Sequence, residues 1–164
     1  MLILVIGAKG GVGATSLAKE LIQGGNRVGL DLADGQLAAQ LERTTWTLTR
    51  VVFSPPRQRR QAIDDVVQRQ TTLLWMPECS LAVEDAAGFV RAVTDRVDVV
   101  ADGGIEPPEE IAALADVVIV VTEDNPVAQY HERKLKERFP DALVTPYDRE
   151  AAQALAEQLF GGSR

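Results

Sequence analysis

Three short runs of consecutive apolar residues dominate the hydrophobic pattern of the chain, at residues 2–6, 97–101 and 117–121. They are rich in Val, Ile and Leu and do not alternate with polar residues, which is typical of strands buried on both faces of a parallel sheet. Weaker strand candidates, each separated from its neighbour by enough chain for a crossover, are residues 27–32, 72–76 and 142–145. The pattern predicts an α/β fold in which helices flank a mostly parallel sheet.

Capping residues mark the expected helix starts. Asn125 stands before Pro126, which combines a cap oxygen with a residue whose missing N–H costs nothing in the first turn. Further starts are predicted after Ser80, Pro107 and Asp148, and the last helix is predicted to end at Gly161. We expect this last helix to pack against the sheet, because it lacks the lysine face of a membrane-surface helix.

Residues 44–60 show no clear periodicity. Threonines lead into Ser54-Pro55-Pro56 and then into an arginine-rich run. We predict that this segment is irregular. Because no long linker divides the sequence, we predict a single domain over residues 1–164.

Composition narrows the classes of function. The 164 residues are 46% hydrophobic and 25% charged, the balance of a soluble globular protein. The formal charge of −7 opposes non-specific attraction to nucleic acid or anionic lipid. One cysteine, Cys79, and one histidine, His131, form no cluster at metal-ligand spacing, and we interpret both as structural. We expect a cytoplasmic protein without a transmembrane segment, since the first apolar run is too short for a signal peptide or a span.

A glycine-rich turn follows the first predicted strand. Residues 7–16 read Gly-Ala-Lys-Gly-Gly-Val-Gly-Ala-Thr-Ser, and a helix is predicted from about residue 14. Glycines let backbone N–H groups point into such a turn, and the helix start adds its positive dipole end, so the segment favours phosphate binding. The Thr15 hydroxyl is placed to ligate Mg²⁺. A glycine-rich turn without a ligand is the alternative, which the spacing disfavours.

Residues 9–16 of this turn resemble the deviant Walker A motif of the ParA/MinD ATPases, KGGxGK[ST][ST], at seven of eight positions. The resemblance implies a P-loop fold that binds ATP with Mg²⁺ through Lys9, Gly10, Gly11, Val12, Gly13, Ala14, Thr15 and Ser16. It also implies that Lys9 acts in catalysis by reaching across a nucleotide-sandwich homodimer. Ala14 replaces the second lysine, as in the CpaE/TadZ branch associated with pilus assembly, which implies weaker ATP binding and slow or absent hydrolysis.

Acidic residues at two further strand ends extend the resemblance. Asp31 matches the first aspartate of the family's second acidic motif and is a candidate catalytic residue, whereas Asp34 falls one position late and equally fits a helix cap. Asp102 matches the Walker B aspartate, which holds Mg²⁺, although an aspartate there often only caps the next loop. The loop at 122–126 resembles the family's loop toward the base.

Three functional readings remain open at this point. The first is a nucleotide-responsive positioning or scaffold protein that recruits a larger protein assembly, in pilus or secretion machinery. The second is an active ParA/MinD-type ATPase of partitioning or division-site placement, and the third is an interaction module that binds no nucleotide. The amide-ligase enzymes of the same family rank last. The arginines at 57, 59 and 60 favour a solvated helix face over a basic surface for a partner or DNA.

Overall fold

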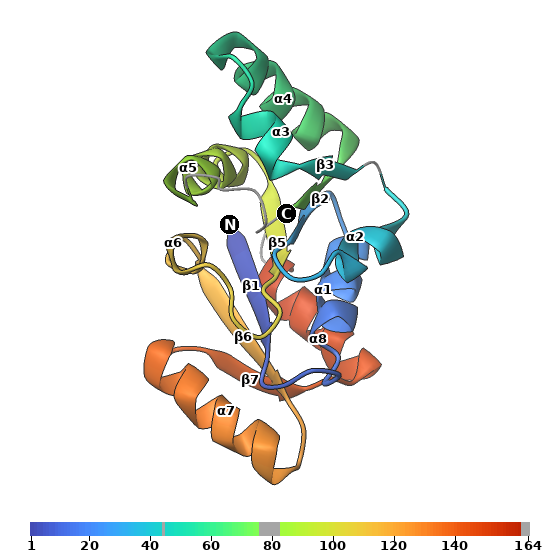
Figure 1. Ribbon diagram of the computed structural model, residues 1–164. Helices are drawn as coiled ribbons and strands as arrows, with labels where there is room; N and C mark the ends of the chain where they lie inside the picture. The colour runs from blue at the N-terminus through green and yellow to red at the C-terminus, as the bar shows by residue number, and fades with distance from the viewer. Residues whose placement is uncertain (44, 76–82, 162–164) are drawn as a thin grey trace.

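The structure, a computed structural model, describes residues 1–43, 45–75 and 83–161. Seven parallel strands form one sheet in the order β3-β4-β2-β5-β1-β6-β7 (Figure 1). The strands are β1 (Leu2–Gly7), β2 (Arg27–Asp31), β3 (Thr45–Thr47), β4 (Thr72–Leu74), β5 (Asp98–Asp102), β6 (Val117–Thr122) and β7 (Leu143–Pro146). The helices are α1 (Ala14–Gln23), α2 (Gln36–Leu41), α3 (Leu48–Val52), α4 (Pro56–Arg69), α5 (Val83–Thr94), α6 (Glu109–Ala112), α7 (Pro126–Arg138) and α8 (Arg149–Phe160).

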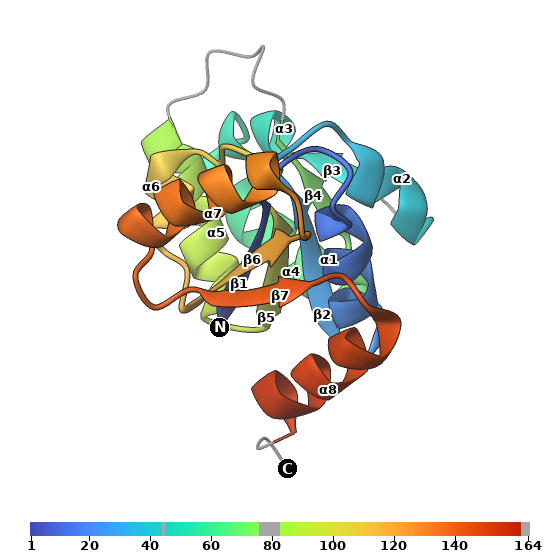
Figure 2. The same cartoon turned by 90° about the horizontal axis from the view of Figure 1, so that it is seen from below.

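Two large hydrophobic cores cover the two faces of the sheet, and a small third cluster lies under α7, made of Ala8, Val120 and Ala128. Alternate residues of β1 point in opposite directions, so that Leu2, Leu4 and Ile6 enter one core and Ile3 and Val5 enter the other. Helices α3 to α6 pack on the first core, and α1, α2 and α8 pack on the second. Figure 2 shows α8 lying beside α1, away from α5 and α6. The sequence prediction of a parallel sheet with helices on both faces is confirmed.

The predicted strands are all present, with ends shifted by one or two residues where the structure describes them. Two of the predicted caps are confirmed, because Asn125 Oδ1 accepts from Ala128 N at 2.9 Å and Asp148 Oδ1 accepts from Glu150 N at 3.2 Å. The last helix packs on the second core and has Gly161 as its C-cap, as predicted. Ser80, the proposed cap of one helix, and Cys79, for which a structural role was proposed, lie outside the described residues.

The prediction that residues 44–60 are irregular is wrong. In the described part of this segment, β3 pairs with β4 at the sheet edge, α3 follows, and α4 begins at Pro56. Each of these elements is short or opens without a side-chain cap, and Pro55 is the N-cap residue of α4. Their order comes from tertiary packing, since Leu48, Val51 and Val52 are buried in the first core.

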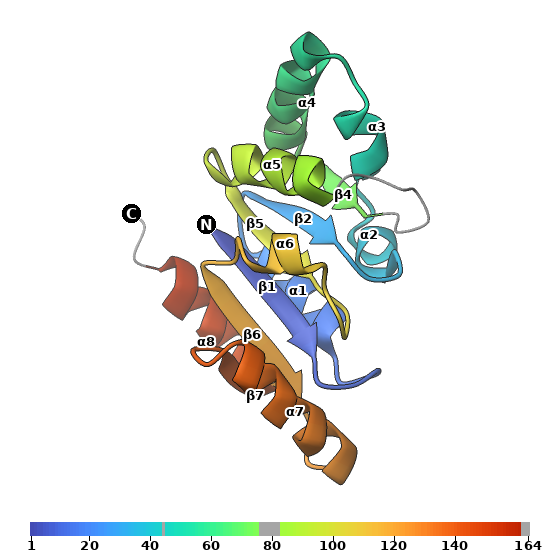
Figure 3. The same ribbon diagram turned by 60° about the vertical axis from the view of Figure 1, so that its left-hand side comes forward.

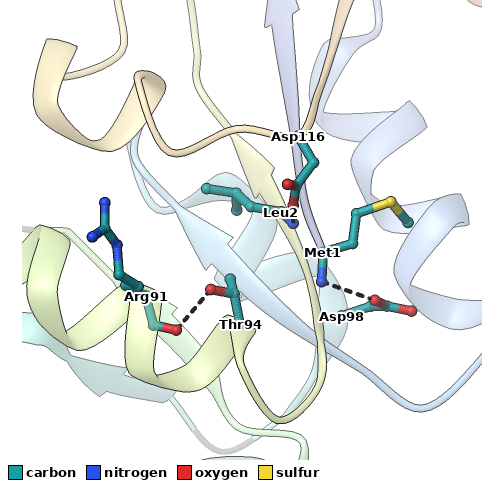
Figure 4. Close-up of polar contacts among 6 residues, drawn as sticks. All are labelled: Met1, Leu2, Arg91, Thr94, Asp98 and Asp116. Atoms are coloured by element: carbon teal, nitrogen blue, oxygen red, sulfur yellow. Dashed lines mark hydrogen bonds and ion pairs between the residues drawn. The ribbon is translucent and has the colours of Figure 1, made fainter.

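Strand β1 is fixed at both ends, which positions the glycine-rich turn that follows it. At the amino end, Leu2 N donates to Asp116 Oδ2 at 2.6 Å, and the Met1 amino group lies 3.2 Å from Asp98 Oδ1 (Figure 4). At the other end, Gly7 N donates to Gly104 O at 2.8 Å. The turn therefore starts from a rigid support.

Candidate phosphate site

The carboxyl ends of five neighbouring strands bring the candidate residues to one edge of the sheet, because all strands run in the same direction. The glycine-rich turn follows β1, while Asp31 and Asp102 end β2 and β5 and are register partners. Glu123 follows β6 and Tyr147 follows β7. The structure thus brings together the residues that the sequence singled out, with Tyr147 beside them.

A cavity of about 340 Å³ lies over the turn. Its lining includes Lys9 to Ser16, which are the predicted nucleotide-binding residues, together with Asp34, Asp102 and Ile105. The N–H groups of residues 10–16 have no acceptor among the described residues. Unpaired N–H groups that meet at a helix start form an anion-binding site, so this cavity suits phosphate.

Gln36 and Gln40 add a polar wall that the sequence did not single out. Both side chains line the same cavity from α2, one helical turn apart. Their spacing of four residues places both on one face of a helix, but the sequence alone does not show that this face of α2 lies over the turn. Amide side chains can donate to a bound phosphate or ribose hydroxyl.

Asp102 is the buried carboxylate of the cavity. It is 1% exposed, its Oδ1 accepts from Gly104 N at 3.1 Å, and its Oδ2 has no hydrogen-bond partner among the described residues. Burial raises the pKa of Asp102; the Thr15 hydroxyl and the Gly104 N–H lower this pKa, and the charges of Asp31 and Asp34 raise it. A buried carboxylate oxygen without a partner, next to a threonine hydroxyl, fits the shell of a Mg²⁺ ion.

No three His, Cys, Asp or Glu side chains converge as metal ligands in residues 1–43, 45–75 and 83–161. Mg²⁺ beside phosphates is typically held by one or two protein oxygens, with waters and substrate oxygens completing its shell. Thr15 and Asp102 are the residues of this chain that would hold the ion.

Asp31 makes a different set of contacts from those of a catalytic base. The side chain is fully buried; its Oδ1 accepts from Ala33 N and Gly35 N at 3.1 and 3.2 Å, and its Oδ2 accepts from Ala38 N at 3.0 Å. These bonds tie the end of β2 to the start of α2. The geometry supports a structural role for Asp31, and the catalytic role stays a prediction.

Asp34 is exposed and lies at the start of α2. Its Oδ1 accepts from Gln36 N at 3.2 Å, and its Oδ2 accepts from the Gln36 amide at 2.8 Å. The N-cap residue of α2 is Gly35, which makes no side-chain cap, so Asp34 stands one position before the cap and its carboxylate bonds to Gln36.

Lys9 is held within its own chain. Its Nζ lies 2.5 Å from Glu123 Oε1, and the same oxygen accepts from Asn125 Nδ2. Asn125 in turn caps α7, so a polar chain of contacts joins the glycine-rich turn to that helix. Glu123 lies in the loop at 122–126 that the sequence singled out, but its contact with Lys9 was not predicted, because only the sheet order places the end of β6 beside the end of β1.

Tyr147 packs on the turn from the other side. A Cβ atom added to Gly13 would lie 2.6 to 2.8 Å from the Tyr147 side chain, which is closer than carbon atoms approach. Gly13 also has a φ of +94°, in the left-handed region that favours glycine. The close approach of Tyr147 and the positive φ both favour glycine at position 13. The sequence around residue 147 did not predict this contact.

Substituting Asp102 by asparagine tests the cost of its charge. The raised pKa means that the folded form takes up a proton more readily than the unfolded chain. We therefore expect the metal-free protein to gain stability as pH falls from above the folded pKa to the ordinary aspartate pKa of about 3.9. Asp102→Asn should remove this dependence and raise stability at neutral pH by about 1.4 kcal/mol for each unit of pKa elevation.

Thermal unfolding of both proteins across this pH window, without Mg²⁺, measures the effect. Asp34→Asn is the matched control, since Asp34 is exposed and lies at the same edge of the sheet. If Asp102→Asn leaves the pH dependence unchanged, the carboxylate does not carry the cost assigned to it.

With its glycine-rich turn at a strand-to-helix junction and a cavity of about 340 Å³ over that turn, the chain has the fold of an α/β protein of the P-loop class. Comparison with solved structures narrows the class to the ParA/MinD fold. A ParA family ATPase from Chlorobium tepidum TLS superposes with a TM-score of 0.65 over 99% of this chain and 93% of that chain, at 14% identity.

Two structures from Aquifex aeolicus are also similar, each at 16% identity. The MinC:MinD cell division protein complex matches with a TM-score of 0.63 over 88% of this chain and 66% of that chain. The MinD cell division protein matches with a TM-score of 0.58 over 94% of this chain and 73% of that chain. No protein-family model matches the sequence, and no similar curated protein was found. At these identities the likeness establishes the fold.

Proposed function

We propose that this protein is a nucleotide-responsive positioning or scaffold factor. In this proposal ATP with Mg²⁺ occupies the cavity over residues 9–16 and stabilises a homodimer, whose surface recruits a larger protein assembly in the cytoplasm. The observation that carries the proposal is that one cavity is lined both by the apolar Ala14 and by Asp102, whose Oδ2 has no hydrogen-bond partner among the described residues. The site keeps the donors for phosphate and the oxygens for Mg²⁺, but lacks the ammonium that assists hydrolysis.

Each group has one role in this proposal. The N–H groups of residues 10–16 bind phosphate oxygens, and Thr15 and Asp102 hold Mg²⁺, which neutralises phosphate charge when bound. Lys9 leaves Glu123 and pairs with the phosphates of the partner's nucleotide. Without a lysine at position 14, charge that develops on the bridging oxygen has no cation of this chain beside it, so turnover is slow or absent.

The wider role rests on the loop and on the fold. The departure at Ala14 is shared with the CpaE/TadZ branch, which supports a role in the assembly of pilus or secretion machinery. The solved MinD structure in complex with MinC supports recruitment of a protein partner by this fold. The part of the chain that the structure describes has no helix of the length and apolarity needed to cross a bilayer.

Two assays test the proposal. Sedimentation with Mg²⁺ and ATP should show a dimer that ADP or chelation of Mg²⁺ dissolves, and a monomer under all nucleotide conditions would contradict the switch. A magnesium-dependent phosphate-release assay separates this function from an active ParA/MinD-type ATPase. Sustained turnover would favour the ATPase of partitioning or division-site placement.

Releasing Lys9 should strengthen the dimer. Glu123→Gln removes the charge that holds Lys9 in its own chain, so we expect nucleotide-dependent dimerisation to tighten by up to about fivefold, the upper range for an exposed ion pair. Lys9→Ala should abolish the nucleotide dependence. Sedimentation equilibrium measures both effects.

Glu132→Gln is the matched control, because it removes a partly exposed ion pair with Lys136 within α7. Equal dimer affinities for the Glu123 and Glu132 variants would show that the contact of Lys9 with Glu123 does not limit dimerisation.

A further inference from the structure

A helical hairpin formed by α3, α4 and the loop between them extends from the β3 side of the sheet. Figures 1 and 3 show it at one end of the molecule, at the opposite end from α7. The nucleotide-binding turn lies elsewhere, between β1 and α1. The hairpin is therefore a surface that the proposed nucleotide function does not use.

The hairpin is a rigid feature. Val51 and Val52 at the end of α3, and Ala62 and Val66 in α4, are buried in the first core. Arg59 Nε donates to Ser54 O at 2.9 Å and closes the loop from inside. Pro55 and Pro56 limit the backbone at the same place. The backbone of the loop at the tip is thus held in place.

Phe53 stands at this tip and is 71% exposed, the highest value among the exposed large hydrophobic side chains of the described residues. Burial of an exposed phenylalanine against a partner is favourable, and aromatic side chains are enriched in interfaces, so Phe53 is a candidate anchor. Arg57 and Arg60, in the first two turns of α4 directly after this loop, are exposed.

The hairpin also carries a charge opposite to that of the rest of the protein. From Leu48 to Arg69 the hairpin holds five arginines, two aspartates and no lysine, a formal charge of +3. The whole chain has 17 basic and 24 acidic residues, a formal charge of −7, so the remainder has a formal charge of −10. All the cations of this stretch are guanidinium groups, whose planar donors suit carboxylates in pairs.

We propose that the α3–α4 hairpin docks an acidic segment of a partner protein, with Phe53 as the apolar anchor and Arg57 and Arg60 as carboxylate ligands. Because the hairpin is basic, its partner should be acidic. The basic surface is confined to the hairpin, so it fits a peptide segment better than a larger anionic surface. A DNA duplex or an anionic membrane is larger than the hairpin, so it would also lie near the acidic remainder of the protein. Charges closer together than the Debye length of about 8 Å are not fully screened, so this remainder would repel it.

Fluorescence anisotropy with the full chain tests this docking surface. The probe is a fluorescein-labelled peptide of repeated Glu-Glu-Leu units, measured at low salt against a short DNA duplex and against vesicles of phosphatidylglycerol. We expect the peptide to bind more tightly than either competitor and to lose affinity as salt rises. The double variant Arg57→Glu with Arg60→Glu should weaken peptide binding by at least about tenfold.

Phe53→Ser should weaken peptide binding without changing its salt dependence, since it removes an apolar contact. The matched control is Arg133→Glu with Lys136→Glu, which makes the same change of net charge at exposed positions of α7. Melting temperatures of all variants establish that the fold is retained. The proposal is overturned if the peptide does not bind, if the control weakens binding as much as the hairpin variant, or if the duplex or vesicles bind more tightly.

This experiment contains no nucleotide, so its result is independent of the phosphate site. Failure of peptide binding removes the hairpin proposal and leaves the proposed nucleotide function in place.

Discussion

Replacing Ala14 by lysine raises the affinity for ATP with Mg²⁺ by about tenfold to a hundredfold. Ala14 is the first residue of α1, is 9% exposed, and lines the cavity over the glycine-rich turn. A lysine there directs an ammonium group toward the phosphates, and a hydrogen bond to a charged group contributes about 1.5–3 kcal/mol net. Each 1.4 kcal/mol is a factor of ten in the dissociation constant. Calorimetric titration of the variant and the natural sequence measures the difference.

Ala14→Met is the control for this experiment, because methionine has nearly the length of lysine and no charge. We expect its affinity for nucleotide to stay at or below that of the natural sequence, since the longer side chain narrows the cavity without adding a donor. Equal affinities for the lysine and methionine variants would mean that position 14 does not face a bound phosphate.

Substituting Gly13 by alanine lowers the free energy of unfolding by about 2 to 5 kcal/mol. A side chain in the left-handed region costs about 1–2 kcal/mol, and φ at Gly13 is +94°. The new Cβ would also lie 2.6 Å from Tyr147 Cγ, and overpacking typically costs about 1–3 kcal/mol. In a domain of this size each kcal/mol corresponds to about 2–4 °C in melting temperature.

Two neighbouring glycines divide this cost into its parts. At Gly11, φ is +81° and no atom lies within 4 Å of an added Cβ, so Gly11→Ala should show the backbone cost alone. Gly10 has open space and no left-handed φ, so Gly10→Ala should have almost no effect on stability. Adding Tyr147→Ala to the Gly13 variant should recover the steric part. Equal melting temperatures for the alanine variants at 10, 11 and 13 would contradict the contact with Tyr147.

Much of the fold could be predicted from local patterns. The apolar runs of β1, β5 and β6 are buried on both faces, and a strand of that kind has an unbroken hydrophobic signature. The caps at Asn125 and Asp148 were readable because they depend on side chains next to the helix start. Both features depend on residues that are neighbours in the chain, so they can be recognised in the sequence itself.

The segment from β3 to the start of α4 could not be predicted because its order comes from distant partners. β3 is three residues long and pairs only with β4, and α3 is five residues long, below the length at which a helix is stable alone. Their apolar residues have no period long enough to identify. They become regular elements because Leu48 and Val51 pack into the core beside α5.

The candidate site was predicted in part for the same reason. Residues 9–16 and Asp102 carry a signal in their own sequence, since a glycine-rich turn and a strand-terminal aspartate are local features. The contact of Lys9 with Glu123 and that of Gly13 with Tyr147 join segments more than a hundred residues apart in the chain. Asp31 was recognised by position, but only its bonds to Ala33, Gly35 and Ala38 reveal how its oxygens are used.

Thermal unfolding with Mg²⁺ and each of ATP, ADP and GTP tests the central claim, that the cavity over residues 9–16 binds a nucleotide. A ligand that binds only the folded state stabilises it by about 2.7 kcal/mol at a hundredfold excess over its dissociation constant. We predict that ATP raises the melting temperature, that chelation of Mg²⁺ reduces the shift, and that Thr15→Ala does the same. The absence of a shift with any nucleotide at millimolar concentration would contradict the claim and identify the chain as an interaction module on a P-loop fold.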